Sequence, residues 1–208
     1  MTSKTQNSPF TMFDTGDVRK IVQDYHLAWV MTSNGEEASL LPLIGVFDGN
    51  GQLVELIGHF ARSNPLNNAF SANPQATILF KGPDGYISPS QAGRRNWGPT
   101  WNYAQLRIKA EITVDTKLTA EALDLLIAHV ERDKPEPWTA SELGERYHDL
   151  IRHIVGFRAK VTELHGRFKL GQDEDAQTLG TILSHTDDDD LVAWMRRFND
   201  ERLDGVGN

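Results

Sequence analysis

The chain of 208 residues contains no cysteine. This absence excludes disulfide bonds, thiolate nucleophiles, iron–sulfur clusters and zinc sites built on cysteine. The sequence also lacks any apolar run that approaches the ~20 residues needed to cross a bilayer, and no basic segment is followed by an apolar run near its start. We therefore expect a cytoplasmic protein.

Several catalytic and metal-binding patterns are missing as well. The sequence has no Gly-x-Gly-x-x-Gly fingerprint, no Walker loop, no His-Glu-x-x-His pair and no Gly-x-Ser-x-Gly elbow. His148 and His153 are five residues apart on a predicted helix, so they do not share a face well enough to bind one metal ion. The aspartates of 187–190 suit a helix N-terminus, and consecutive carboxylates point in different directions. We predict neither a metal site nor an amino-acid catalytic centre.

Positive charge is scarce relative to negative charge. The chain has 21 Lys and Arg against 29 Asp and Glu, a formal net charge of −8 and a pI near 5.3. Proteins that bind DNA directly usually carry a basic patch or a high pI. The basic residues that do cluster, Arg94 with Arg95 and Arg167 with Lys169, lie in or beside the candidate ligand motifs described below. No helix-turn-helix pair is evident, so the sequence argues against direct DNA binding.

What is present is the pattern of one globular domain, with 39% hydrophobic and 24% charged residues. Alternating apolar residues predict a half-buried strand over 104–114, and Asn34-Gly35 predicts a hairpin. We expect a mainly β fold with helices, antiparallel, after a loose start at residues 1–13. The expected strands are 27–32, 38–46, 52–59, 76–81, 86–88 (after a turn at Asp84-Gly85), 104–114 and 155–164. The expected helices follow Asp14 or Thr15, span 65–72, begin at Thr119 and Thr139, and span 191–198.

The stretch from His59 to Tyr103 holds the candidate ligand residues. Arg62, Ser63 and Asn64 offer a guanidinium fork, a hydroxyl and an amide, which are the donors that bind a phosphate. They also precede a predicted helix, whose N-terminus favours an anion. The alternative is an ordinary exposed loop. His59 ends the strand before this turn, and it either contacts the ligand or anchors the loop by a structural hydrogen bond.

A second group lies at the head of the strand that begins near residue 101. Trp101, Asn102 and Tyr103 could provide a flat wall and hydrogen-bonding groups for a planar ring, or they could be core residues. Tyr86 and Ser88 are weaker candidates, because alternation turns only one side of their strand toward a ligand. The segment 91–99, with two glycines and two arginines, is either a mobile loop over the site or a plain surface connection.

Together these segments resemble a known family. The motifs HFARSNP (59–65), FKGPDGYISPS (80–90), GPTWNYAQL (98–106) and GRFKLGQ (166–172) are similar to successive motifs of the PaiB family. These are FMN-binding split β-barrel proteins described as negative transcriptional regulators. The resemblance runs from about Ala28 to Gln172. It implies a barrel like that of pyridoxamine-phosphate oxidase, with FMN bound at a homodimer interface. The whole chain, 1–208, would be one such domain, with a helical insertion at 116–154 and a C-terminal tail and helix at 173–208.

The resemblance also implies roles for individual residues. Arg62, Ser63 and Asn64, beside His59, would contact the FMN phosphate or ribityl chain. Lys169 and Gln172 would do so too, from the same or the partner subunit. Trp101, Asn102 and Tyr103 would line the isoalloxazine ring. The chain departs from the family pattern at three places: Gly171 replaces a serine, Asp173 replaces an asparagine, and Gln91-Ala92-Gly93 follows Ser90 where an aromatic pair is common. A carboxylate at Asp173 lowers phosphate affinity unless it faces away.

Other functions stay open at this stage. A flavin-dependent oxidoreductase or flavin reductase needs no acid–base side chain, because the flavin carries the redox chemistry. A haem-handling split barrel would use His59, His165 or His185. A scaffold without ligand is the third alternative. Whether the chain is an enzyme is thus not decided by its sequence.

Overall fold

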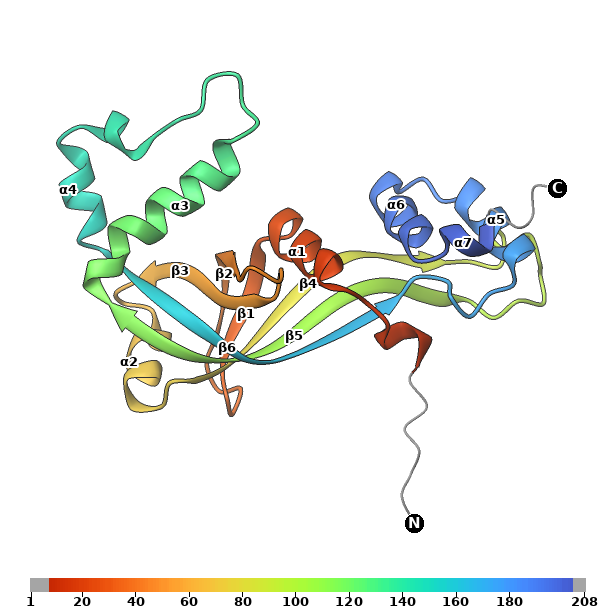
Figure 1. Cartoon of the computed structure of the whole chain (residues 1–208), viewed down its shortest axis with the longest axis horizontal. Helices are drawn as coiled ribbons and strands as arrows, with labels where there is room; N and C mark the ends of the chain where they lie inside the picture. The colour runs from red at the N-terminus through yellow and green to blue at the C-terminus, as the bar shows by residue number, and fades with distance from the viewer. Residues whose placement is uncertain (1–7, 204–208) are drawn as a thin grey trace, which may run out of the picture. The chain divides into compact units, whose positions relative to one another are not determined.

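The computed structural model describes residues 8–203, which form two compact units. The barrel unit comprises 14–80 and 106–165, and the terminal unit comprises the described residues 8–13, 81–105 and 166–203. Figure 1 follows the chain through both, with the strands as arrows. Each unit is described by itself. The predicted loose start falls partly on residues 1–7, which lie outside the described residues.

In the described part of the chain, six antiparallel strands close into a barrel in the order β1-β2-β3-β6-β5-β4. Pairing between β1 and β4 completes the closure, with Ala28 opposite Phe80 and Trp29 opposite Leu79. The antiparallel, mainly β fold with helices is therefore confirmed. The strands are β1 (Leu27–Thr32), β2 (Ala38–Phe47), β3 (Leu53–Ala61), β4 (Gln75–Ile87), β5 (Thr100–Asp115) and β6 (Ile154–Lys169).

Alternation along the strands fills the barrel. Leu106 and Ile108 of β5 are fully buried, whereas Arg107 between them is exposed, as the sequence pattern predicts. Phe60 stacks on Phe157 with 5.1 Å between ring centroids. Packing at Gly58 is so close that a Cβ there would lie 2.6 Å from a Leu43 methyl carbon. The interior is thus filled by side chains and leaves no room for a larger residue at this position.

Helices α1 (Thr15–Asp24), α2 (Pro65–Ala72), α3 (Thr119–Glu131) and α4 (Arg146–Ile151) belong to the barrel unit. Asp14 and Asp17 form a capping box that begins α1 where the sequence predicts it. The helix expected to begin at Thr139 is interrupted: a 3-10 turn, Ala140–Leu143, ends at Gly144 with φ 56°, and α4 follows. Helix α3 begins at Thr119 as predicted, but Leu118 occupies the cap position without a side-chain hydrogen bond. The Thr119 hydroxyl instead accepts a hydrogen bond from the Gly156 N–H at 3.1 Å.

The terminal unit has a small core of its own around Phe168. Its ring lies 4.9 Å from that of Phe198, 6.0 Å from Trp194 and 5.2 Å from Phe13. The unit also contains helices α5 (Ala176–Ser184), α6 (Asp189–Arg197), which carries Trp194, and α7 (Asp200–Leu203). The sequence interpretation missed α5, although Asp175 caps it. None of the described helices combines the length and the apolar character that crossing a membrane requires.

The predicted turn at Asp84-Gly85 is wrong. β4 runs unbroken from Gln75 to Ile87, and the φ of Gly85 is not positive. A Cβ on Gly85 would lie 2.6 Å from a methyl carbon of Leu191 in α6. The glycine is therefore required for close packing and not for chain reversal. Similarly, β6 does not end at Leu164 but continues to Lys169.

Candidate functional site

The candidate phosphate residues lie where β3 leads into α2 in the barrel unit. We call His59, Arg62, Ser63 and Asn64 the polar turn. Asn64 caps α2: its Oδ1 accepts from the Leu66 N–H at 3.0 Å, and its Nδ2 donates to Ser39 Oγ at 2.9 Å. The amide of Asn64 is thus used to hold the turn in place.

Arg62 makes hydrogen bonds through its backbone N–H and its Nε. Its backbone N–H donates to the His153 carbonyl at 2.9 Å, and its Nε donates to the Arg152 carbonyl at 2.8 Å. Among the described residues, neither terminal guanidinium nitrogen has a partner, and the neighbouring Ser63 hydroxyl has none either. An oriented guanidinium, a hydroxyl and the N-terminus of α2 lie together, and this donor set fits a phosphate.

His59 is the more buried member of the polar turn. Its Nδ1 is buried and has no hydrogen-bond partner among the described residues. Burial lowers the pKa of His59 below its ordinary value of 6.5, so the neutral imidazole is favoured at neutral pH. A buried nitrogen without a partner costs about 1–3 kcal/mol. A ligand group that bonded to this nitrogen would therefore be stabilised.

The candidate ring residues lie in the terminal unit. Trp101 is 53% exposed and Tyr86 is 49% exposed, and their ring centroids are 5.9 Å apart. With Tyr103 they form what we call the aromatic wall. A hollow of about 320 Å³ adjoins it, lined by Lys81, Asp84, Trp101, Tyr103, Ala104 and Gln105. Large exposed aromatic faces are uncommon on a protein surface unless a ligand or a partner covers them.

Cationic side chains flank the aromatic wall. Arg167 Nε donates to the Tyr103 hydroxyl at 2.9 Å. Lys169 Nζ donates to the Trp101 carbonyl at 3.3 Å and to the Thr100 hydroxyl. Sequence reasoning proposed Lys169 as a ligand residue but not Arg167. The signal was available, because alternation places residues 167 and 169 on the same side of β6.

Two other predicted ligand residues have internal partners. Asn102 is 2% exposed, and its Nδ2 donates to the Met195 sulfur at 3.5 Å. Alternation explains this, because residue 102 faces away from residues 101 and 103. Gln172 bonds to its own chain: its Oε1 accepts from the Leu170 N–H and its Nε2 donates to the Phe168 carbonyl, both at 2.7 Å.

The departure from the family pattern at Gly171 has a structural reason. Gly171 has φ 93°, a conformation that a serine rarely adopts. A Cβ at this position would also lie 2.8 Å from a methyl carbon of Leu179 in α5. Glycine therefore fits the turn by which the chain leaves β6. The next departure, Asp173, has an exposed side chain.

Comparison with protein families gives one match over most of the chain. The family described as "Putative FMN-binding domain" matches residues 6–163. A curated relative, the "Protease synthase and sporulation protein PAI 2" of Bacillus subtilis (strain 168), is 29% identical over 171 residues. That alignment covers 80% of this chain and 81% of the relative.

Solved structures share the fold. The FAD and haem binding protein from Mycobacterium smegmatis superimposes with a TM-score of 0.59 at 14% identity, covering 84% of this chain and 80% of that one. A flavocytochrome from Azotobacter vinelandii gives 0.51 at 16% identity, covering 76% and 68%. At such identities the likeness shows the fold alone, and it confirms the predicted split barrel.

The lowered pKa of His59 predicts a pH-dependent stability. Below pH 6.5 the unfolded chain binds a proton at this residue that the folded chain does not, so the free energy of unfolding falls as pH drops from 6.5 toward the folded pKa. Urea unfolding of the wild type at pH 7.5, 6.5 and 5.5 should show this loss, and His59→Gln should reduce it. His148→Gln, at an exposed histidine, is the matched control. Equal pH dependence in the His59 variant and the wild type would contradict the assignment.

Proposed function

The chain belongs to the family of FMN-binding domains, and from this we propose that it is a flavin-dependent regulator of the PaiB type that acts as a homodimer. Its cofactor is FMN. The regulatory role that we propose rests on the resemblance to the PaiB family, and the Bacillus subtilis relative carries the name "Protease synthase and sporulation protein PAI 2". The absence of cysteine is consistent with the cytoplasmic location that we predict.

The phosphate end of FMN is assigned to the polar turn. The observation that carries this assignment is the Arg62 guanidinium: its Nε donates to the Arg152 carbonyl, and its terminal nitrogens stay unpaired among the described residues. The Arg62 backbone N–H donates to the His153 carbonyl and holds the turn. Ser63 adds a hydroxyl donor, and Asn64 keeps the turn in shape. We keep His59 as a contact of the same ligand end, although its Nδ1 is buried in the single chain. A guanidinium fork and a phosphate form paired, charge-assisted hydrogen bonds.

The resemblance assigns the flavin ring to the aromatic wall, which belongs to the terminal unit, and we keep this as a separate part of the proposal. When bound, the flavin accepts and donates electrons, and the protein controls access to it. Trp101 and Tyr103 offer flat contact, and Arg167 and Lys169 offer positive charge. For Lys169 itself, we propose a contact with the phosphate or the ribityl chain of FMN in the homodimer. Gln172 and Asn102 could contact the ligand only if they gave up the internal hydrogen bonds that they make.

An apolar face on the barrel supports the homodimer. Trp29 of β1 lies between Leu40 of β2 and Leu79 of β4, and paired residues point to the same side of a sheet. Trp29 is 48% exposed and Leu40 is 44% exposed, so this outer face is apolar and open. A symmetric second copy of the chain, presenting the same face, would cover it.

The net charge of the chain affects whether it can regulate by binding DNA directly. A net charge of −8 disfavours direct contact with DNA, so we propose that regulation passes through another molecule.

A second candidate, a flavin oxidoreductase, is favoured by one observation. Trp101 and Tyr86 are about half exposed in the single chain, which leaves the wall open to a reductant.

The phosphate assignment predicts that Arg62→Ala weakens FMN binding. The loss should be about 1.5–3 kcal/mol, the usual contribution of a hydrogen bond to a charged group. Titration of FMN fluorescence against the apo protein measures it. Arg146→Ala, which removes another exposed arginine of the same unit, should leave the affinity unchanged. Equal affinities for the two variants would show that the polar turn does not bind the phosphate.

The dimer assignment predicts that Trp29→Lys yields monomers. The side chain is half exposed in the single chain, so the variant should fold, while a lysine at the centre of the apolar face would oppose association. Light scattering after size-exclusion chromatography reports the mass. Leu125→Lys, at a similarly exposed leucine of α3, should stay dimeric. A wild type that runs as a monomer, or a dimeric Trp29 variant, would refute this interface.

The proposed mode of regulation predicts no direct DNA binding. Gel-shift titrations with the protein's own upstream DNA should show no complex even at low salt, where contacts to phosphate are strongest. Steady-state oxidation of NADH or NADPH with added FMN should be slow if regulation is the main role. A salt-sensitive DNA complex would overturn the indirect mode, and rapid turnover would favour the oxidoreductase.

A further inference from the structure

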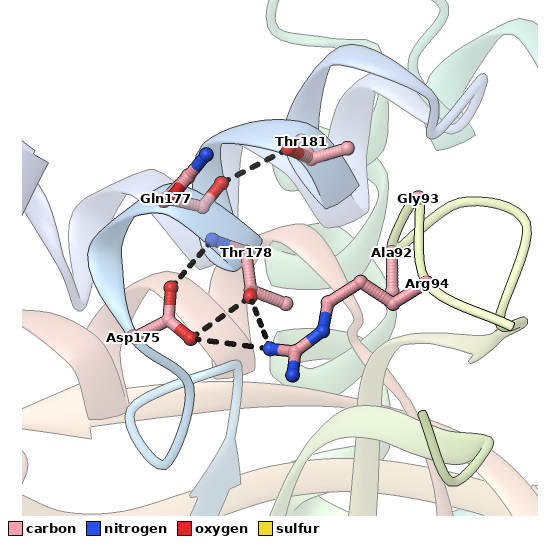
Figure 2. Close-up of a pocket in the computed structure, with 7 residues that line it drawn as sticks. All are labelled: Ala92, Gly93, Arg94, Asp175, Gln177, Thr178 and Thr181. Carbon is pink, nitrogen blue, oxygen red and sulfur yellow. Dashed lines mark hydrogen bonds and ion pairs between the residues drawn. The ribbon is translucent and has the colours of Figure 1, made fainter. Parts of the chain in front are cut away.

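Residues 88–99 form the loop that joins β4 to β5 in the terminal unit, and its side chains reach the C-terminal segment. Figure 2 shows Arg94 extended toward Asp175 and Thr178 at the start of α5. The guanidinium lies 3.7 Å from the Asp175 carboxylate and 3.5 Å from the Thr178 hydroxyl. Hydrogen bonds from Thr178 and the charge of Arg94 lower the pKa of Asp175. The carboxylate therefore stays charged and available to Arg94 at neutral pH.

Other side chains of the loop make similar contacts. The Trp97 indole N–H donates to the Glu174 carboxylate at 3.0 Å, and the Gln91 amide donates to the Thr186 hydroxyl at 3.4 Å. Trp97 is partly buried, whereas Arg94 and Asp175 are more than half exposed. Exposed ion pairs contribute little and hydrogen bonds to a charged group contribute more. The hydrogen bond between Trp97 and Glu174 is thus the main contact that holds the loop to the C-terminal segment.

The loop connects the strand ends that carry the aromatic wall. Tyr86 lies two residues before the loop, and Trp101 lies two residues after it. These strand ends also pack on α6, since Gly85 lies against Leu191 and Asn102 bonds to Met195. The separation between the Tyr86 and Trp101 rings therefore depends on how the loop and the strand ends are held by residues 174–195.

We propose that Trp97, assisted by Arg94, is a positioning residue for flavin binding. By tying the loop to the C-terminal segment, it holds Tyr86 and Trp101 in the arrangement that receives the ring. This proposal rests on the proposed function. The anchors Glu174, Asp175 and Thr178 lie outside residues 6–163, the part that matches the family, so family membership does not assign this role.

The experiment compares Trp97→Phe with the wild type. Phenylalanine keeps an aromatic ring but removes the N–H that binds Glu174. Loss of this one bond should raise the dissociation rate of FMN by about 3- to 10-fold. In the FMN-free protein, it should also speed backbone hydrogen exchange over 86–101, relative to residues 104–114 of β5. Flavin fluorescence during dilution and exchange mass spectrometry measure the two effects.

Matched variants separate positioning from general destabilisation. Glu174→Ala should reproduce both effects, and the double variant should be no worse than either single one, because they remove the same bond. Trp138→Phe removes an indole in the barrel unit, and Arg95→Ala removes the exposed guanidinium next to Arg94 in the same loop. Both variants should match the wild type.

The outcomes also distinguish this inference from the proposed function. If the wild type binds FMN and Trp97→Phe shows unchanged dissociation and unchanged exchange, the positioning role is overturned. If the effects of the two single variants on dissociation and exchange add fully in the double variant, the Trp97–Glu174 hydrogen bond does not hold the loop, and the positioning role is overturned as well. If the wild type does not bind FMN, the proposed function itself fails, whatever the exchange of the loop shows.

Discussion

Pairing of β1 with β4 is the constraint on which the barrel depends. It closes the sheet, so that the backbone groups of both strands bond to each other instead of forming free edges. Closure places Ala28, Val30, Ile78 and Phe80 inside. It also fixes which side chains point outward, and so places Trp29 between two leucines. The same pairing thus determines both the core and the apolar face that we assign to the dimer.

Local patterns were sufficient to predict much of the barrel. Alternation identified the strand at 104–114, and Asn34-Gly35 identified the first hairpin, where Gly35 has φ 75°. The turn predicted at Asp84-Gly85 failed because the reason for this glycine lies far along the chain, at Leu191. A turn glycine and a packing glycine have the same sequence signal. Only the tertiary contact tells them apart.

The two groups of candidate residues were predictable to different degrees. Donor chemistry in Arg62-Ser63-Asn64 is visible in the sequence, but the backbone carbonyls that orient Arg62 come from residues 152 and 153, which no local pattern connects to it. At residues 101–103, strict use of alternation would have separated the buried Asn102 from its exposed neighbours. The internal role of Gln172 depends on the turn over residues 168–172, which begins only at the end of β6.

The glycine at 171 has a consequence for the end of the chain. Its backbone angle and the nearby Leu179 both disfavour a side chain, so the choice of residue at 171 is linked to the packing of α5. A serine at this position would strain the backbone and press on Leu179. The path that the chain takes after its last strand is thus set by contacts within residues 171–179, beyond the part of the chain that matches the family.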